Sequence, residues 1–384
     1  MKRNFLFLYL NTGGGHISPA KVLKDAVIAR YPDARVTLLH GFAPGQYISK
    51  GIWEKGYETA CDLLPGAYSV TYDAFKLHSL QSFGFKTFFP GAIRHIEEKI
   101  RELDITDIVS FHFILTPCAL KAVKRSGRVI PVTAVVTDPF SPHPIWFYPE
   151  NAVRYVVSSP EVRAAALDRL RIAAHRIAEF PFFVDPSFYA RADSARLKER
   201  YGFRPDAPVV LISGGGGGLP LSLALVREWQ RCGGRAALAV VCGRNGRLKR
   251  ALESLAAAHP EAKLRVYGFV PFMSDLVRLC DCAVTKAGAS SLFELLAAKK
   301  PLIICSYIHG QELGNVRYAV RNRVGWFIRT PAAICDKIAQ VTEDAAYYGD
   351  VRRRLDSLSP DRYAERMSAA AAYVAEESGS DPFR

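Results

Sequence analysis

The chain begins with FLFLYLNTGGGH at residues 5–16, and a similar pattern returns as PVVLISGGGGG at residues 208–218. Each stretch is a continuous apolar run that ends in glycines. An apolar run without polar alternation is typical of a strand that is buried on both faces. Glycines directly after such a strand indicate a turn whose backbone N–H groups can approach a ligand closely. The two stretches therefore predict two α/β units in series.

Strands and helices alternate after each of these starts. We expect strands at 5–10, 35–39, 107–113, 132–137, 155–158, 208–213, 236–242, 264–267, 282–285 and 301–305, and helices at 20–30, 221–232, 246–258, 290–298 and 312–322. Strands that alternate with helices indicate parallel sheets. The predicted fold class is α/β with two Rossmann-like, doubly wound domains. A segment at 180–187 with two prolines is the expected linker.

The composition is that of an ordinary globular protein, with 384 residues, 49% hydrophobic and 23% charged. The formal net charge is +14, and basic residues exceed acidic ones in both halves of the chain. This excess fits an anionic partner such as nucleic acid, a nucleotide donor or an anionic membrane face, and solubility alone is the alternative. A nucleic-acid partner is not expected, because the sequence has no helix-turn-helix, RNA-recognition or zinc signature.

The cysteines and the chain start suggest neither a metal site nor a secreted protein. Of the eight cysteines, Cys280 and Cys282 are two apart, but no second pair lies at zinc-finger spacing. The apolar start is too short for a signal peptide, and glycines stand where a cleavage site would be. No apolar stretch approaches the 18 residues of a membrane-spanning helix. We expect a cytoplasmic protein that binds no metal and requires no cofactor.

The first glycine run is the place where we expect acid–base chemistry. His16 follows Gly14 and Gly15 at the carboxyl end of the first strand, where ligands of open α/β sheets bind. An imidazole near neutral pKa is a suitable general base for a hydroxyl nucleophile, and a helix-capping role is the alternative. The run matches neither the dinucleotide fingerprint nor the P-loop pattern.

Three stretches of the second half suit a phosphorylated sugar. Five glycines at 214–218 are costly in backbone entropy, so they favour an anion-binding nest over an ordinary loop. TKAGASS at 285–291 ends a strand and opens a helix, as a pyrophosphate site does, and Glu294 one turn later could accept from both ribose hydroxyls. YIHGQE at 307–312 offers an amide and a carboxylate for sugar hydroxyls. For Glu294 and Glu312, ordinary helix residues are the alternative.

Two stretches of the first half suit an acceptor. TDPFSPHPIW at 137–146 follows a strand and is stiffened by three prolines, and its Asp138 could orient a histidine or contact the acceptor. Residues 42–89 hold eleven aromatic residues together with Lys50, Lys55, Lys76 and Lys86. Aromatic and basic residues on one segment suit a membrane interface, and a helical insertion packed on the core is the alternative.

The motifs, taken in order, are similar to those of a known family. The run GFVPFMSDLVRLCDCAVTKAGASSLFELLAAKKPLIICSYIHGQELGNVRYAVRNRVGWF at 268–327 resembles the donor domain of monogalactosyldiacylglycerol synthases and processive diacylglycerol glucosyltransferases. These are related to the peptidoglycan lipid I N-acetylglucosaminyltransferase in glycosyltransferase family 28. NTGGGHISPAKVL at 11–23 and VTDPFSPHPIWF at 136–147 resemble the family's first loop and acceptor-side loop.

The resemblance implies the GT-B fold, with an acceptor domain at 1–180, a linker at 181–187, a donor domain at 188–358, and a helix within 359–384 that crosses back to the first domain. The two domains would face each other across a cleft. It implies an inverting enzyme that moves a hexose from a UDP-sugar to a lipid acceptor, first of all diacylglycerol, at the anionic inner face of the cell membrane. Two alternatives stay open: an N-acetylglucosamine transferase that acts on an undecaprenyl-linked or other glycolipid, and a non-catalytic UDP-sugar-binding protein.

The resemblance also implies roles for single residues, carried over by position. The catalytic residues would be His16 and Asp138, and the acceptor side would include Gly14, Gly15, His143 and Trp146. The donor-binding residues would be Gly215, Gly216, Phe269, Val270, Ala287, Gly288, Ala289, Ser290, Glu294, Gln311, Glu312 and Asn315. One departure stands in the diphosphate loop, where this chain has Ala-Ser-Ser at 289–291 and the family more often has Pro-Gly-Thr.

Overall fold

The computed structural model describes residues 3–11, 14–46, 51, 89–148, 153–260, 263–360 and 362–376. Most of the aromatic and basic segment at 42–89 lies outside the described residues, as do Thr12 and Gly13 of the first glycine run.

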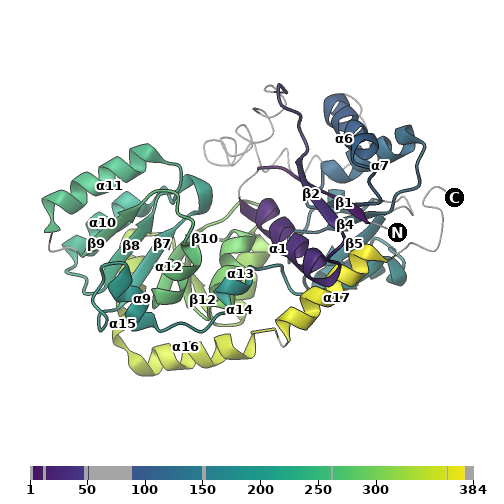
Figure 1. Cartoon of the computed structure of the whole chain (residues 1–384). Helices are drawn as coiled ribbons and strands as arrows, with labels where there is room; N and C mark the ends of the chain where they lie inside the picture. The colour runs from purple at the N-terminus through teal and green to yellow at the C-terminus, as the bar shows by residue number, and fades with distance from the viewer. Residues whose placement is uncertain are drawn as a thin grey trace. The chain divides into compact units, whose positions relative to one another are not determined.

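The chain divides into two units (Figure 1). Unit 1 comprises Met1–Phe183, His309–Gln311 and Pro360–Arg384, and unit 2 comprises Val184–Ile308 and Glu312–Ser359. The segment 181–187 is thus split between the units. Residues 309–311 group with unit 1, although we expected all of 188–358 in the second domain.

Unit 1 is built on a sheet of six parallel strands in the order β2-β1-β3-β4-β5-β6. The strands are β1 Asn4–Tyr9, β2 Arg35–His40, β3 Asp107–Ser110, β4 Val132–Val135, β5 Val153–Val157 and β6 Ile177–Glu179. Alternate residues of β1 point to opposite faces: Phe5 and Phe7 join one core cluster, and Leu6 and Leu8 join the other. All four are fully buried, which explains the uninterrupted apolar run.

Helices cover both faces of this sheet (Figure 1). The Phe5 and Phe7 face carries α1 Gly14–Arg30 and α17 Tyr363–Ala375, which pack side by side. The opposite face carries α6 Pro90–Glu102, α7 Leu115–Ser126 and α8 Pro160–Asp168. The small side chains of Ala370 and Ala371 let α17 approach the sheet closely, so the end of the chain completes the core of unit 1.

Unit 2 is built on a second sheet of six parallel strands, in the order β12-β11-β10-β7-β8-β9. The strands are β7 Val209–Ser213, β8 Ala237–Val241, β9 Leu264–Tyr267, β10 Cys282–Lys286, β11 Leu302–Ser306 and β12 Gly325–Phe327. Its helices are α9 Ser194–Arg200, α10 Ser222–Arg231, α11 Gly246–Ala258, α12 Met273–Leu279, α13 Ala289–Ala297, α14 Leu313–Arg321, α15 Pro331–Glu343 and α16 Ala345–Ser357. Helices α10, α11 and α15 share one core cluster with the strands.

Each sheet has a point where the strand order reverses. In unit 1 this point lies between β1 and β3, and in unit 2 it lies between β7 and β10. Open parallel sheets bind their ligands outside the carboxyl ends of the strands at this point. The predicted fold class, two doubly wound α/β units, is confirmed.

Several predicted boundaries are wrong near the site, and the strand expected at 132–137, for example, ends at Val135. The helix expected from Ala20 begins at Gly14 and contains Pro19 at its sixth position, where a proline cannot donate the usual backbone hydrogen bond. The strand expected at 107–113 ends at Ser110. There the Ser110 hydroxyl donates to the carbonyl of His112 at 3.0 Å, and this local bond competes with continued strand pairing.

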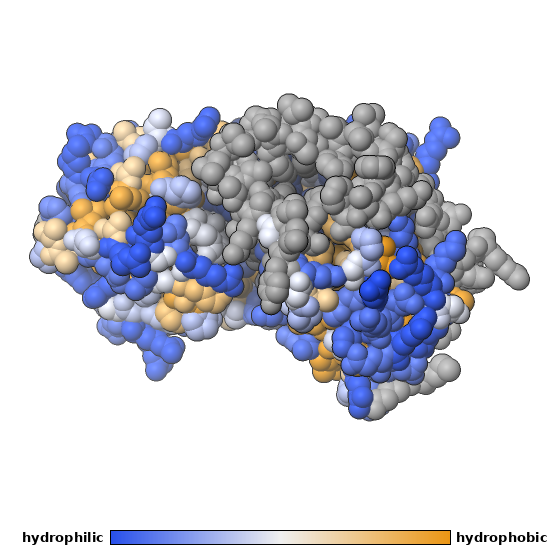
Figure 2. All heavy atoms as spheres, turned by 90° about the horizontal axis from the view of Figure 1, so that it is seen from above, coloured by the Kyte–Doolittle hydropathy of each residue, from blue (hydrophilic) through white to orange (hydrophobic). Residues whose placement is uncertain are grey.

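The described surface is mostly hydrophilic in the view of Figure 2, and hydrophobic residues form smaller areas on it. Within the described ranges, every helix is too short or too polar to span a bilayer.

Candidate functional site

His16 lies in the first turn of α1, next to the reversal point of the unit 1 sheet. Its Nδ1 lies 2.7 Å from the carbonyl oxygen of Phe111, which follows β3. Because a carbonyl only accepts hydrogen bonds, Nδ1 carries the proton, and the lone pair of the neutral ring is on Nε2. The hydroxyl oxygen of Thr137 lies 2.8 Å from the same Nδ1. The backbone after β3 and the side chain after β4 thus fix the orientation of this ring.

A second histidine packs against His16. The ring centroids of His16 and His112 are 4.6 Å apart, and both residues are buried. The backbone N–H of Ile114 donates to Nδ1 of His112 at 3.2 Å, so neutral His112 carries its proton on Nε2. Burial lowers the pKa of His16 to about 4, and the bond to Phe111 partly offsets this effect. Burial and then the charge of His16 lower the pKa of His112 well below its usual range. Both rings are neutral at pH 7.

The predicted acceptor-side loop lies in the same unit. Asp138 is buried, and its Oδ2 accepts from the indole Nε1 of Trp146 at 2.7 Å. The ring centroids of Trp146 and His16 are 6.5 Å apart. Nδ1 of His143 accepts from the backbone N–H of Ile145 at 3.1 Å and so caps the short 3₁₀ helix Pro144–Trp146. The loop therefore holds Asp138 through the indole group and places the indole near the His16 ring.

The glycines before His16 are not required by the packing of the described residues. A Cβ atom on Gly14 or Gly15 would have no heavy atom within 4 Å. Among the described residues, side chains at these two positions would therefore meet no obstacle, beside a buried histidine.

The second glycine run lies at the reversal point of unit 2, directly after β7. A Cβ on Gly214 would come within 2.3 Å of the Gly218 carbonyl oxygen, and one on Gly218 within 2.8 Å of the Cys242 carbonyl oxygen. Gly215 and Gly218 have φ of +78° and +74°, which favours glycine. Among the described residues, a Cβ on Gly216 would have one neighbour within 4 Å, Nη1 of Arg244 at 3.9 Å, and one on Gly217 would have none. The packing thus explains the ends of the run but not Gly216 and Gly217.

The stretch after β10 lies across the same reversal point. Ala287 is buried, and its carbonyl accepts from Nδ2 of Asn315 at 2.7 Å. Nζ of Lys286 lies 3.4 Å from Oε1 of Glu312, whose Oε2 accepts from the backbone N–H of Ile308 at 2.7 Å. A Cβ on Gly288 would lie 3.7 Å from the same Oε1 of Glu312. The structure thus brings Ala287, Gly288, Glu312 and Asn315 together.

Two polar atoms at this stretch have no hydrogen-bond partner in the described structure, Oγ of Ser290 and Oδ1 of Asn315. Buried polar atoms are almost always paired, so this stretch has hydrogen-bonding capacity for a ligand.

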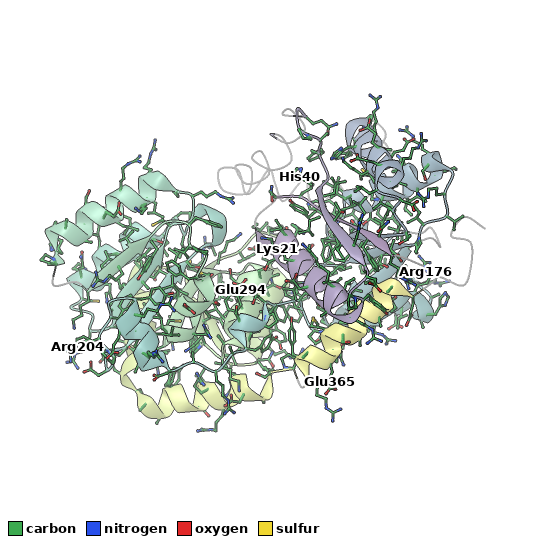
Figure 3. The ribbon with its side chains drawn as sticks, viewed as in Figure 1. Lys21, His40, Arg176, Arg204, Glu294 and Glu365 are labelled. Atoms are coloured by element: carbon green, nitrogen blue, oxygen red, sulfur yellow. The ribbon has the colours of Figure 1, made fainter. Side chains whose placement is uncertain are left out.

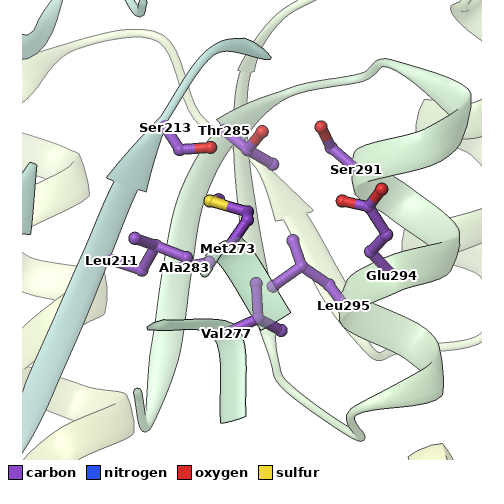
Figure 4. A pocket seen from close by; sticks show the side chains of 9 residues that line it. All are labelled: Leu211, Ser213, Met273, Val277, Ala283, Thr285, Ser291, Glu294 and Leu295. Atoms are coloured by element: carbon purple, nitrogen blue, oxygen red, sulfur yellow. The ribbon is translucent and has the colours of Figure 1, made fainter. Parts of the chain in front are cut away.

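Glu294 lies on α13 (Figure 3) and lines a pocket between α12, α13 and the strands β7 and β10. Figure 4 shows the side chains of Glu294 and Ser291 directed from α13 towards Thr285 and Ser213 on the strands. Burial raises the pKa of the Glu294 carboxyl to about 7, and the charge of Asp185 adds to the shift. The pocket combines a carboxyl group with three hydroxyl groups, above an apolar base that includes Leu211, Met273, Val277 and Leu295.

The remaining predicted donor residues lie apart from this pocket lining. Phe269 and Val270 follow β9, and the Phe269 side chain is 66% exposed. Gln311 belongs to the segment His309–Gln311 that groups with unit 1.

Several residues of the site were not found from the sequence. The Phe111 carbonyl and His112 fell inside a predicted strand, and a lone histidine among apolar residues gives no functional signal. Asp185 was assigned to the linker. Arg244 follows β8 at the glycine run, and in a chain with 51 Lys and Arg a single arginine does not attract attention. In the described ranges, no group of three or more His, Cys, Asp or Glu side chains could hold a metal ion.

Comparison with known proteins agrees with this arrangement. The glycosyltransferase family 28 C-terminal domain matches residues 209–347. Monogalactosyldiacylglycerol synthase 2 of Arabidopsis thaliana is 30% identical over 353 residues, which are 86% of this chain and 71% of that protein. Three further synthases are similar, from Nicotiana tabacum, Arabidopsis thaliana and Glycine max. The chain spans 64% to 67% of the length of these proteins.

Two solved structures have the same fold at low identity. MurG of Acinetobacter baumannii has a TM-score of 0.62 at 13% identity, over 96% of this chain and 99% of that chain. TcCGT1, in complex with UDP, has a TM-score of 0.64 at 13% identity, over 98% of this chain and 99% of that chain. The fold is thus that of the GT-B glycosyltransferases. From its match to the Arabidopsis synthase and to the family domain, the chain belongs to glycosyltransferase family 28, in the group of the monogalactosyldiacylglycerol synthases.

Proposed function

We propose that the protein is an inverting glycosyltransferase that moves a hexose from a UDP-sugar to a lipid acceptor, with diacylglycerol as that acceptor. The observation that carries the proposal is the protonation state of His16 and the position of its proton. Its Nδ1 is bound to the Phe111 carbonyl, and burial keeps its ring neutral, so Nε2 has a lone pair for a proton. A neutral imidazole can take the proton of an acceptor hydroxyl, but with a pKa of about 4 His16 is a weaker base than the near-neutral imidazole that we expected from the sequence.

The proposed reaction is a single displacement at the anomeric carbon. Nε2 of His16 takes the proton of the acceptor hydroxyl while the hydroxyl oxygen forms a bond to the anomeric carbon. The bond from that carbon to the diphosphate oxygen breaks, and its electron pair leaves with UDP. Negative charge grows on the diphosphate, and we propose that the backbone N–H groups at the start of α13, residues 289–291, stabilise it.

The donor part of the proposal is supported by the polar groups at the reversal point of unit 2. Glu294, when ionised, can accept from both ribose hydroxyls. The unpartnered atoms of Ser290 and Asn315 offer bonds to the diphosphate and the sugar. We propose Gly215, Gly216 and Ala287–Ser290 near the phosphates, Phe269 and Val270 beside the uracil, and Gln311 and Glu312 on the sugar. TcCGT1, which has the same fold, was solved with UDP.

The acceptor part rests on the relatives, which are named as monogalactosyldiacylglycerol synthases. We propose that Asp138, His143, Trp146 and the open side of Gly14 and Gly15 receive the acceptor. The net charge of +14 and the aromatic and basic segment at 42–89 fit an anionic membrane surface. We therefore propose that the protein acts at the inner face of the cell membrane without spanning it.

The test is transfer from UDP-sugars to diacylglycerol by the wild-type chain and by His16→Ala and Glu294→Ala. We expect both variants to lose most of the activity, and His175→Ala, which removes an exposed histidine, to retain it. Wild-type rates in both site variants would contradict the proposal.

A panel of acceptors and donors then defines the reaction. Mass spectrometry of the lipids formed in a host that expresses the protein identifies the sugar and the lipid. Transfer of N-acetylglucosamine to a polyprenyl-linked acceptor would identify the protein as an N-acetylglucosamine transferase, which is the alternative activity. Binding of UDP without transfer to any acceptor would make it a binding protein.

A further inference from the structure

The loop after β8 is locked onto the glycine run of unit 2. The backbone N–H of Arg244 donates to the Gly216 carbonyl at 2.8 Å. A Cβ on Gly243 would lie 2.3 Å from the same carbonyl oxygen, and its φ is +57°, so only glycine fits there. On the other side, the side chain of Asn245 caps α11 by accepting from the backbone N–H of Leu248 at 3.0 Å. These contacts fix the position of Arg244 relative to the glycine run.

The guanidinium of Arg244 lies between the glycine run and the loop after β9. Its Cζ is 5.1 Å from the ring centroid of Phe269. Its Nη1 is 3.9 Å from the position that a Cβ on Gly216 would occupy. This is a cation–π contact, and the side chain of Arg244 forms no hydrogen bond within the described ranges, so its N–H donors stay available. The three loops after β7, β8 and β9 thus meet at this one side chain.

The charge of Arg244 has no carboxylate partner in the part of the chain that the structure describes. The residue is exposed, and it forms no ion pair with any carboxylate of the described ranges. The Phe269 ring beneath it is 66% exposed. An arginine beside an aromatic ring, with neither a carboxylate partner nor a side-chain hydrogen bond among the described residues, suits an anion with several oxygen atoms, such as a phosphate.

The glycine run offers room for that anion. The packing requires glycine at 214 and 218. A Cβ at 216 or 217 would meet no described residue except Arg244, which lies at van der Waals distance from position 216. Glycine at these two positions keeps free the space that Nη1 of Arg244 faces.

We infer that Arg244 binds a phosphate group of the nucleotide donor on the open side of Gly216 and Gly217. This inference rests on the proposed function and extends it with a residue outside the stretch at 285–312. We infer the phosphate rather than the base as the ligand, because Nη1 of Arg244 lies beside the glycine run, where glycine at 216 and 217 leaves room among the described residues. Arg244 is therefore a binding residue for the donor. Loss of its guanidinium N–H donors weakens the binding of every ligand that carries that phosphate.

The experiment measures the affinities of uridine, UMP and UDP for the full chain and for Arg244→Ala, Arg244→Lys and Arg247→Ala. Arg247 is the matched control, because it is an exposed arginine three residues further along, at the start of α11. We expect Arg244→Ala to weaken UDP binding at least tenfold and Arg244→Lys by an intermediate factor. Uridine binding should change less than twofold in both variants, and Arg247→Ala should change no affinity more than twofold.

The ligand series also locates the phosphate. A loss for UMP and UDP alike assigns Arg244 to the phosphate next to the ribose, and a loss for UDP alone assigns it to the terminal phosphate. Equal losses for uridine and UDP would overturn the inference, since Arg244 would then contact the nucleoside. Unchanged UDP affinity in Arg244→Ala would also overturn it and would leave the proposed function standing. Failure of the wild-type chain to bind UDP would overturn both.

Discussion

The two units share a plan of six parallel strands, but the reversal points of their sheets carry different chemistry. In unit 1 this point holds aromatic rings and two neutral histidines, His16 and His112. In unit 2 it holds glycines, hydroxyl groups and the carboxyl group of Glu294. Burial favours the neutral form in both places, so it lowers the pKa of His16 to about 4 and raises that of Glu294 to about 7. The comparison teaches that burial alone keeps the histidine ring neutral around pH 7 and brings the ionisation of the carboxyl group into the neutral range.

The largest effect should come from removing the base of unit 1. We expect His16→Ala to lower the transfer rate at saturating donor about 100-fold to 10,000-fold, the range that a general base contributes. Steady-state kinetics with UDP-sugar and diacylglycerol measure this, with a folded protein checked by circular dichroism. A loss of less than tenfold would show that another group takes the proton.

The glycine run of unit 2 allows a comparison of two similar changes. Gly218→Ala forces a Cβ against the Cys242 carbonyl at a φ of +74°, and we expect it to destabilise the protein by about 2 kcal/mol. Gly217→Ala meets no heavy atom and should leave the melting temperature unchanged while it weakens UDP binding. Thermal unfolding and UDP titration of both variants measure these effects. Equal melting temperatures for the two variants would contradict the packing of this loop.

The carboxyl group of unit 2 should determine the pH dependence of donor use. An ionised carboxylate accepts from both ribose hydroxyls, so kcat/KM for the UDP-sugar should rise with pH through about 7. In Glu294→Gln the rise should disappear, and kcat/KM at pH 8 should be about tenfold lower, as for the loss of one hydrogen bond to a charged group. Profiles of kcat/KM between pH 5.5 and 8.5 measure this, and a rise that persists in the variant would assign it to another group.

The smallest effect concerns stability. The folded-state pKa of Glu294, about 7, lies above its ordinary value of 4.5, so the folded state binds more protons between these values. The free energy of unfolding therefore falls as pH rises from about 4.5 to about 7. Glu294→Gln removes this contribution and should be more stable than the wild type at pH 8, by on the order of 1 kcal/mol, with no gain at pH 4.5. Melting curves of both proteins at the two pH values measure the difference. A gain of the same size at both values would have a cause other than ionisation.

Much of the fold could be predicted from the sequence because the strands are buried on both faces. Phe5–Leu8 and Val209–Ile212 are apolar throughout, and β9 and α11 were predicted at their exact bounds. The strands β6 and β12 were not predicted. Each has only three residues and lies at the edge of its sheet, where one neighbouring strand suffices and no long apolar run is needed.

The site could be predicted only in part, because its geometry comes from groups that leave no mark in the sequence. His16 and Glu294 stand in recognisable motifs, but the proton position on His16 is set by the Phe111 carbonyl. Every residue has such a carbonyl, so no residue type signals it. Arg244 reaches the glycine run because β7, β8 and β9 are neighbours in the sheet, and this order is a property of the fold.

The central claim is that unit 2 binds the donor and unit 1 supplies the base. Calorimetric titration of UDP into His16→Ala and Glu294→Ala, alongside the wild-type chain, tests it most directly. We predict that His16→Ala binds UDP within twofold of the wild-type affinity and that Glu294→Ala binds it about tenfold more weakly, as expected for a lost charged hydrogen bond. If His16→Ala lost as much UDP affinity as Glu294→Ala, or if Glu294→Ala bound UDP as the wild type does, the claim would be contradicted.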